Sequence, residues 1–251
     1  MPTNAGDIAL SPDERFLAVT GWETILGNLY PISIVDLETR TLADKIQIPG
    51  LQLHWGAAFG PDGSVLFSAS GGVRRLAVDA SGKITNTGET FGPMTGALTW
   101  APSNVEIAPS GTFAVGTYDG APRGILITFG VPDMEELSRV RLDDPFADWA
   151  GFSADGRHLF AASSSAGVRR GTLQAFDVDP TTGIIGAHRW TNYGLSPGSV
   201  YGLDHVGLDS TGLRLFGEYE DRLLIRDARH GTLLGQLPLP AGTYLSTAVA
   251  R

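Results

Sequence analysis

Short apolar runs separated by turn residues recur along the chain, and the same order of runs returns five times. Each repeat has an apolar run, a turn containing Pro, Asp, Ser, Thr or Gly, and a second apolar run. In such a turn Pro presets φ, Asp caps the backbone and Gly supplies positive φ, so each one predicts a β-hairpin. The five turns lie about 45 to 56 residues apart, at 11–15, 60–64, 108–112, 153–157 and 209–213.

Each repeat also predicts a third and a fourth strand. An Asp ends four of the five third-strand runs, where it is expected to accept hydrogen bonds from backbone amides and start the next turn. The third strands are expected at 32–36, 73–79, 124–129, 172–177 and 222–227, and the fourth at 42–48, 83–89, 137–142, 184–190 and 233–237. The repeating unit is therefore four antiparallel strands.

Five copies of a four-stranded unit favour an all-β fold of the β-propeller type over a two-sheet sandwich, because a sandwich does not require one unit to recur. We expect a single domain over 1–251 with one further innermost strand at 243–251. The five blades are expected at about 7–50, 51–100, 101–146, 147–199 and 200–242.

The extra strand after five blades has three explanations. The chain is a fragment of a six-to-eight-bladed ring, a five-bladed ring with an added strand, or a partial ring completed by another copy. We favour the fragment. An open ring exposes the apolar faces of its first and last blades, and such faces promote self-association.

The repeats resemble the WD40 and YVTN-type propeller superfamily. The last repeat, from Leu213 to Gly231 with Asp227 ending its third strand, is similar to a WD40 repeat, except that Arg226 stands where WD40 repeats carry Trp. The first repeat, at 32–41, is more similar to the YVTN repeats of bacterial surface and lactonase-like proteins. The resemblance implies seven blades in most relatives and functions that range from partner docking to lactone hydrolysis.

Composition narrows the range of partners. The 251 residues include 18 Lys and Arg against 27 Asp and Glu, a formal net charge of -9, and no Cys. This acidic balance argues against nucleic acid and anionic membranes as partners, and the lack of Cys excludes disulfides and thiolate metal sites. With no signal peptide and no apolar stretch of membrane-spanning length, the default location is cytoplasmic, or extracytoplasmic if the N-terminus is truncated.

Candidate binding residues follow from the register of the innermost strands. These strands surround one channel in a propeller, so positions at the same distance before each turn meet at one rim. The oxygen ligands there suit a divalent cation such as Ca²⁺ and the two Trp side chains suit an organic ligand, although no spacing matches a metal motif and local strand capping explains the same residue types. The rim residues are Asp7, His54, Trp55, Asn104, Asp148, Trp149, Asp204 and His205.

Glu106 breaks a pattern of small residues. Two residues before the turn the other repeats carry Ala9, Ala58, Gly151 and Gly207. A carboxylate among small residues beside a channel suggests acid or base chemistry, or pairing with a cation or Arg, while a glutamate that points into a solvent-filled channel or is paired locally fits the same position. Glu106 is therefore the candidate catalytic residue.

Two functions from different classes fit these observations. The leading interpretation is a non-enzymatic module that binds a protein or small ligand at the channel mouth, because it needs no catalytic constellation and no cofactor. The alternative is a lactonase-like hydrolase that uses a channel-mouth metal or carboxylate, with its candidates at Glu106, His54, Asp148, Asp204 and His205.

Overall fold

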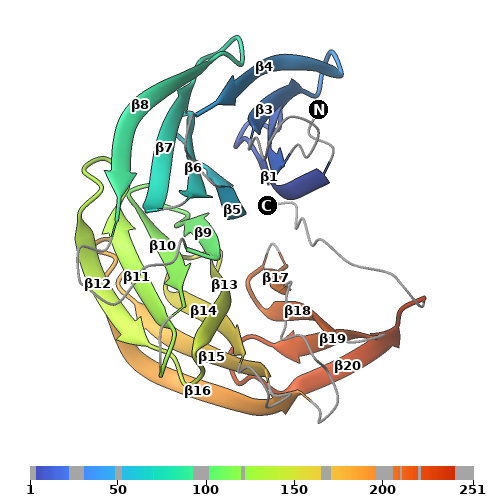
Figure 1. The fold of residues 1–251 in the computed structure, drawn as a ribbon. Helices are drawn as coiled ribbons and strands as arrows, with labels where there is room; N and C mark the ends of the chain where they lie inside the picture. The colour runs from blue at the N-terminus through green and yellow to red at the C-terminus, as the bar shows by residue number, and fades with distance from the viewer. Residues whose placement is uncertain are drawn as a thin grey trace.

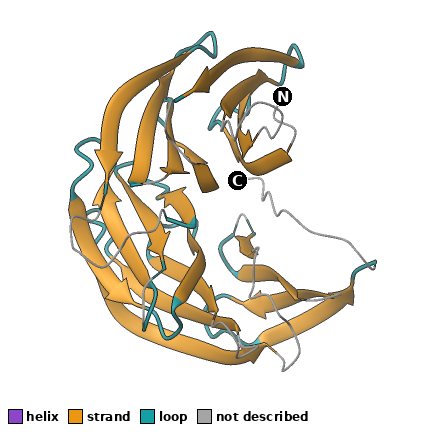
Figure 2. Cartoon of the chain, viewed as in Figure 1, coloured by secondary structure: helices purple, strands orange, loops and turns teal. Residues whose placement is uncertain are grey.

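The computed structural model describes most of the chain as β-structure. Its described residues are 4–22, 31–48, 53–69, 71–92, 102–119, 122–164, 171–195, 206–209, 211–219 and 222–240. These residues form strands joined by turns and contain no helix (Figure 2). No helix in this part of the chain is long and apolar enough to cross a membrane.

The strands form five four-stranded antiparallel sheets, named blades 1 to 5 in chain order. Blade 1 contains β1 (Asn4–Leu10), β2 (Phe16–Trp22), β3 (Pro31–Asp36) and β4 (Thr41–Gln47), and blade 2 contains β5 (Leu53–Phe59), β6 (Ser64–Ala69), β7 (Gly72–Val78) and β8 (Ile84–Phe91). Blade 3 contains β9 (Asn104–Ile107), β10 (Phe113–Tyr118), β11 (Ile125–Gly130) and β12 (Glu136–Arg141). Blade 4 contains β13 (Phe146–Phe152), β14 (His158–Ser164), β15 (Gly171–Val178) and β16 (Ile185–Leu195), and blade 5 contains β17 (Val206–Leu208), β18 (Arg214–Tyr219), β19 (Arg222–Asp227) and β20 (Leu233–Pro238).

Within each blade the four strands are arranged in chain order from a common axis to the periphery. The first strands β1, β5, β9, β13 and β17 lie next to one another, and the fourth strands lie at the periphery (Figure 1). The blades stand in an arc with an opening between blade 1 and blade 5 (Figure 1). The structure confirms the predicted all-β propeller of five blades, while the predicted strand at 243–251 lies outside the described residues.

The core is divided among the seams between neighbouring blades. Four apolar clusters each combine side chains from two adjacent blades. In the seam between blades 2 and 3, Phe91 stacks on Phe129 with ring centroids 4.3 Å apart. In the next seam, Phe113 meets Phe152 edge to face at 5.4 Å. Because inner blades bury both sheet faces, strands such as β6 are buried at every position rather than at alternate ones.

The ten turns that join first to second strands and third to fourth strands each contain one residue with positive φ. Between first and second strands these are Glu14 (58°), Gly63 (79°), Gly111 (73°), Gly156 (68°) and Gly212 (66°). Between third and fourth strands they are Arg40 (56°), Gly82 (80°), Met134 (55°), Gly183 (72°) and Gly231 (70°). The sequence repeat is therefore also a repeat of backbone conformation.

The predicted capping role of the strand-end Asp residues is confirmed in three blades and wrong in one. Asp36 accepts from the amide of Thr39 (2.9 Å), and Asp79 and Asp227 accept from amides two residues on. In blade 4 the third strand continues to Val178, so Asp179 caps the turn. Asp177 remains on the strand and pairs with Arg189 at 2.6 Å.

Arg226, at the position of the WD40 Trp, is buried in the seam between blades 4 and 5. Its Nη1 donates to the carbonyl of Gly231 at 2.9 Å, which ties the third strand to the following turn. Burial lowers the pKa of this guanidinium. At this position the chain therefore carries a buried side chain that bonds to the following turn.

Candidate binding site at the channel mouth

The innermost strands are irregular at the mouth of the channel. The pairing of β1 with β2 shifts between Ala5 and Asp7, and that of β13 with β14 shifts between Ala147 and Trp149. In β13 the extra residue is Asp148. A β-bulge redirects side chains and is common beside binding sites. Two of the rim positions derived from the sequence, Asp7 and Trp149, thus border these shifts, whereas Asn104 pairs regularly with Thr117.

Asp7 links blade 1 to blade 2 at this end. Its amide donates to the buried Thr20 Oγ1 at 2.9 Å, and its carboxylate Oδ2 accepts from the amide of Ala57 on β5 at 2.9 Å. A half-buried carboxylate in this position satisfies a backbone donor of the neighbouring innermost strand. Asp7 therefore holds two blades in register.

Asn104 repeats this arrangement between blades 3 and 4. Its amide donates to Thr117 Oγ1 at 2.9 Å, and its side-chain Oδ1 accepts from the amide of Ala150 on β13 at 3.2 Å. The register argument correctly made Asp7 and Asn104 equivalent. Their oxygens bridge seams between blades, which accounts for these residue types without a ligand.

Trp149 covers the innermost strand of blade 4. A Cβ at Gly151 would lie 2.4 Å from Cζ2 of Trp149, so the small residue at 151 leaves room for the indole ring. The half-buried ring also packs on the apolar cluster between blades 4 and 5. Asp148 is half-buried beside it. A half-buried carboxylate and a half-buried indole ring are thus carried by consecutive residues at the bulge in β13.

Glu106 occupies the predicted register position on β9, opposite Val115. Ala9 lies opposite Ala18 and Gly151 opposite Phe160, so small residues hold the same place in blades 1 and 4. Strand alternation puts Glu106 on the same side as Asn104, which faces β13, and both side chains are half-buried. The carboxylate of Glu106 is therefore close to the seam between blades 3 and 4.

The structure brings part of the predicted rim together. Asn104 contacts β13, the strand that carries Asp148 and Trp149, and Asp7 contacts β5. Among the described residues, no three His, Asp or Glu side chains form a group that could hold a metal ion. For His54 and Trp55 on β5 only the backbone is described, and Asp204 and His205 lie outside the described residues. Ligand binding at the rim remains a prediction.

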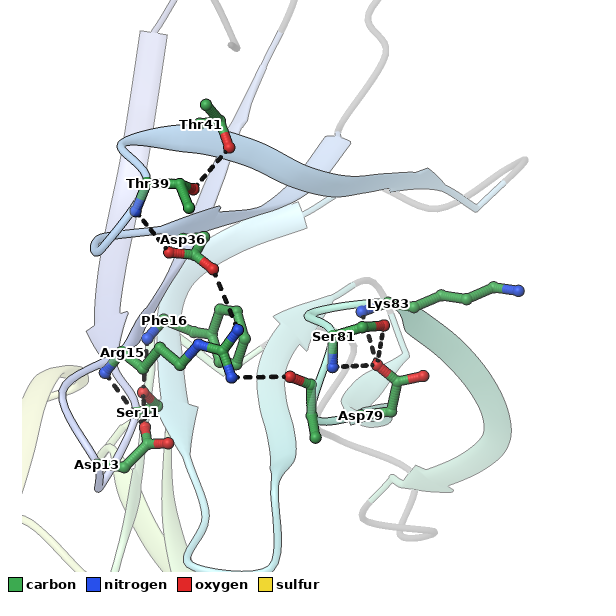
Figure 3. A network of polar contacts seen from close by, with 11 residues as sticks. Ser11, Asp13, Arg15, Phe16, Asp36, Thr39, Thr41, Asp79, Ser81 and Lys83 are labelled. Atoms are coloured by element: carbon green, nitrogen blue, oxygen red, sulfur yellow. Dashed lines mark hydrogen bonds and ion pairs between the residues drawn. The ribbon is translucent and has the colours of Figure 1, made fainter.

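The opposite face of the propeller is formed by the hairpin turns, and Asp residues cap them. Figure 3 shows the network in blades 1 and 2. Asp13 accepts from Ser11 Oγ at 2.6 Å, which lowers the pKa of that carboxyl, and Arg15 reaches across the seam to the carbonyl of Ala80 at 3.0 Å. The turn face is therefore connected by hydrogen bonds within and between blades and is rich in ionised carboxylates.

A groove on the turn face was not predicted from the sequence. It has a volume of about 390 Å³ and lies between blades 4 and 5, with Ala154 and Asp155 on one side and Leu213 and Arg229 on the other. The one feature of the sequence that could have indicated the groove is Ala154, because the corresponding turns of blades 1, 2 and 3 have the larger Pro at this position.

Neither known family models nor curated proteins match this sequence. Solved structures do match. A protein from Lactobacillus plantarum has a TM-score of 0.74 and 17% identity, covering 94% of this chain and 72% of that chain. A functionally unknown protein from Desulfotomaculum acetoxidans has a TM-score of 0.72 and 20% identity, covering 92% and 71%.

The Cps50 (Swd1) β-propeller domain of Myceliophteria thermophila has a TM-score of 0.70 and 13% identity, covering 94% of this chain and 74% of that chain. At these identities the likeness shows the fold. The protein is a β-propeller, which is the fold that the resemblance of its repeats implied.

Proposed function

We propose that the protein is a non-enzymatic binding module that docks a protein or small ligand at the channel mouth. The observation that carries this proposal is the placement of Asn104, Asp148 and Trp149 on adjoining innermost strands at one end of the channel. A fold of this kind hosts many functions, so the site and not the fold supports the proposal.

The chemistry of the mouth suits recognition by mixed polar and aromatic contacts. A half-buried indole offers a large apolar surface at low entropic cost, and neighbouring oxygens add directional hydrogen bonds. The seam bonds made by Asp7 and Asn104 hold these groups on a rigid frame. Preorganised groups bind more tightly because less motion is lost on association.

Site-specific photo-crosslinking in native cells tests the proposal. A photoreactive residue replaces Asp148 at the channel mouth, and a matched variant carries it at the exposed Glu38 in a turn on the opposite face. We expect one adduct that forms from position 148 and not from 38, and saturable binding of the identified partner by calorimetry. Equal labelling from both positions, or none, overturns docking at the mouth.

The hydrolase alternative depends on Glu106. We expect no turnover of a panel of lactones and esters, and no rise in Tm with Ca²⁺, since only a ligand bound to the native state raises Tm. If the protein hydrolyses one of these substrates, and Glu106→Gln abolishes the activity while the fold persists, the hydrolase interpretation replaces that of a binding module. Glu106→Gln is preferred to alanine because it retains the volume of a half-buried side chain.

A further inference from the structure

The groove between blades 4 and 5 arises from two shortened side chains on opposite sides of one seam. On the blade 4 side, the first residue after the start of the turn is Ala154, whereas blades 1, 2 and 3 carry Pro12, Pro61 and Pro109. Pro61 packs directly on the turn of blade 3, since a Cβ at Gly111 would lie 2.2 Å from its ring.

The blade 5 side is shortened at Ala228. Its amide donates to the carbonyl of Leu213 at 2.9 Å, the bond that Val78, Val131 and Val178 make in blades 2, 3 and 4. Each of those Val side chains packs into the apolar cluster of its seam. A Pro ring and a Val side chain are thus replaced by two methyl groups, and this leaves the open groove of about 390 Å³.

Asp155 and Arg229 carry opposite charges on the walls of the groove, and of these two only Asp155 is engaged by neighbouring groups. Asp155 accepts from Ser153 Oγ at 2.6 Å and from the amide of Arg157 at 3.1 Å, and these bonds lower its pKa and keep it ionised. Arg229 is exposed, and in the described part of the chain its guanidinium makes no ion pair. On a protein with net charge -9, this free cation favours a carboxylate ligand.

The apolar part of the groove is formed by Ala154, Ala228 and Leu213, of which Leu213 is 45% exposed. The volume is within the range of sites that enclose small ligands or a few side chains. An incoming apolar side chain of the size of Leu, Ile or Pro would occupy the space that Pro and Val fill in the other seams. Such a contact buries Leu213 at the same time.

We propose that this groove binds a short peptide segment of a partner protein in which an apolar side chain is adjacent to a carboxylate. The apolar side chain lies over Ala154 and Ala228, and the carboxylate pairs with Arg229. This inference rests on the proposed function as a binding module and adds a second surface, on the face opposite the channel mouth.

The test fills the groove with the residues that the other blades use. Ala154→Pro costs no hydrogen bond, because the amide of Ala154 donates to no acceptor in the described structure, and Ala228→Val retains the bond to Leu213. The combined variant should keep or raise Tm. Leu37→Val in the corresponding turn of blade 1 is the matched control.

A phage-displayed library of random peptides is selected on the unmodified protein, and the enriched peptides are synthesised with a fluorophore for polarisation assays. We expect apolar and acidic residues side by side in the enriched sequences. Affinity should fall at least about tenfold in the filled variant and stay unchanged in Leu37→Val. Arg229→Gln should weaken binding roughly three- to tenfold and reduce its dependence on salt.

Peptides that bind the filled variant as tightly as the unmodified protein overturn the groove as the site and leave the binding module itself standing. Failure to enrich any peptide also overturns the groove proposal. The proposed function is decided separately, by the crosslinks from position 148.

Discussion

At the scale of single residues, the turns differ in how well their sequence suits their backbone. Seven of the ten positive-φ turn positions are Gly, and the exceptions are Glu14, Arg40 and Met134. For a residue with a Cβ the left-handed conformation costs about 1 to 2 kcal/mol. Blade 1 has such a residue in both its β1–β2 turn and its β3–β4 turn, so substitution to Gly should stabilise this blade more than any other.

Glu14→Gly is expected to stabilise the protein by about 0.5 to 1 kcal/mol. The strain of a Cβ at φ 58° is removed, and this gain is partly offset by the greater freedom of Gly in the unfolded chain. Urea denaturation measures the change. The reciprocal control is Gly111→Ala, whose Cβ would lie 2.2 Å from Pro61 and should therefore lower stability. Equal effects of the two substitutions would contradict the argument.

The seam role of Asn104 predicts a loss of stability when its side chain is removed. Asn104→Ala leaves the amide of the fully buried Ala150 without its acceptor, which costs about 1 to 3 kcal/mol. Calorimetric unfolding measures this loss, with Asn104→Asp as a control that keeps an acceptor oxygen in place. A residue that serves only a ligand would leave the stability of the free protein unchanged.

Sequence register correctly paired Asp7 with Asn104, yet it did not reveal what their oxygens contact. Both oxygens bond to amides on the next blade, 50 and 46 residues further along the chain. Spacing within one repeat defines a position along its strand. It carries no information on the distance to the neighbouring strand, which depends on how two sheets pack.

At the scale of elements, the hairpin turns are built around ionised Asp. The capping carboxylates accept hydrogen bonds from nearby amides and hydroxyl groups, as Asp79 does from Ser81 and Lys83. The pKa is lowered at Asp13, Asp36, Asp62, Asp79, Asp155, Asp179, Asp209 and Asp227. The stability of the turns in blades 1, 2, 4 and 5 therefore depends on carboxylates that acid would protonate.

These lowered pKa values predict acid denaturation with a definite sign. A carboxyl whose pKa is lower in the folded state stabilises the fold fully above its unfolded pKa of about 3.9, and this contribution is lost as pH falls through the folded pKa. We expect the urea midpoint to vary little between about pH 5 and 8 and to fall steeply below about pH 4.

The matched variant for this experiment is Asp179→Asn, which keeps one oxygen acceptor for the amides of Thr181 and Thr182 and does not titrate. Its stability should fall less between pH 5 and 3 than that of the unmodified protein. A main loss of stability between pH 7 and 5 would assign the effect to other groups.

The turns were also the elements that the sequence predicted best. Their Pro, Asp and Gly residues act within a few positions of one another, so the local sequence is sufficient. The groove was missed for the opposite reason. Within its own turn, Ala in place of Pro at position 154 does not predict a groove. The groove becomes evident only when Ala228 is seen to lie across the same seam, because the two small residues together leave the space open.

At the scale of the whole molecule, blade 1 presents an apolar sheet face at the opening of the arc. Leu10, Leu17, Val35 and Leu42 lie opposite one another across its four strands. Leu17 is half-buried and Val35 is 8% exposed, so the exposed side chains are those at the two ends of the row. In blade 2 the position equivalent to Leu10 is Phe59, which is 9% exposed because it packs on blade 1. Leu10 and Leu42 are 43% and 46% exposed.

From these exposed Leu side chains we predict that the protein self-associates. Burial of exposed Leu side chains contributes about 25 cal/mol per Å², and an apolar sheet face matches the contacts by which the other blades pack. Sedimentation velocity should show a mass that rises with concentration, and Leu10→Asp with Leu42→Lys should reduce that rise while circular dichroism stays unchanged. Leu137→Lys, at an exposed position on the outer strand of blade 3, is the control and should associate like the unmodified protein. If both variants associate equally, the contact involves another surface, and Leu10 and Leu42 are exposed side chains that remain in water.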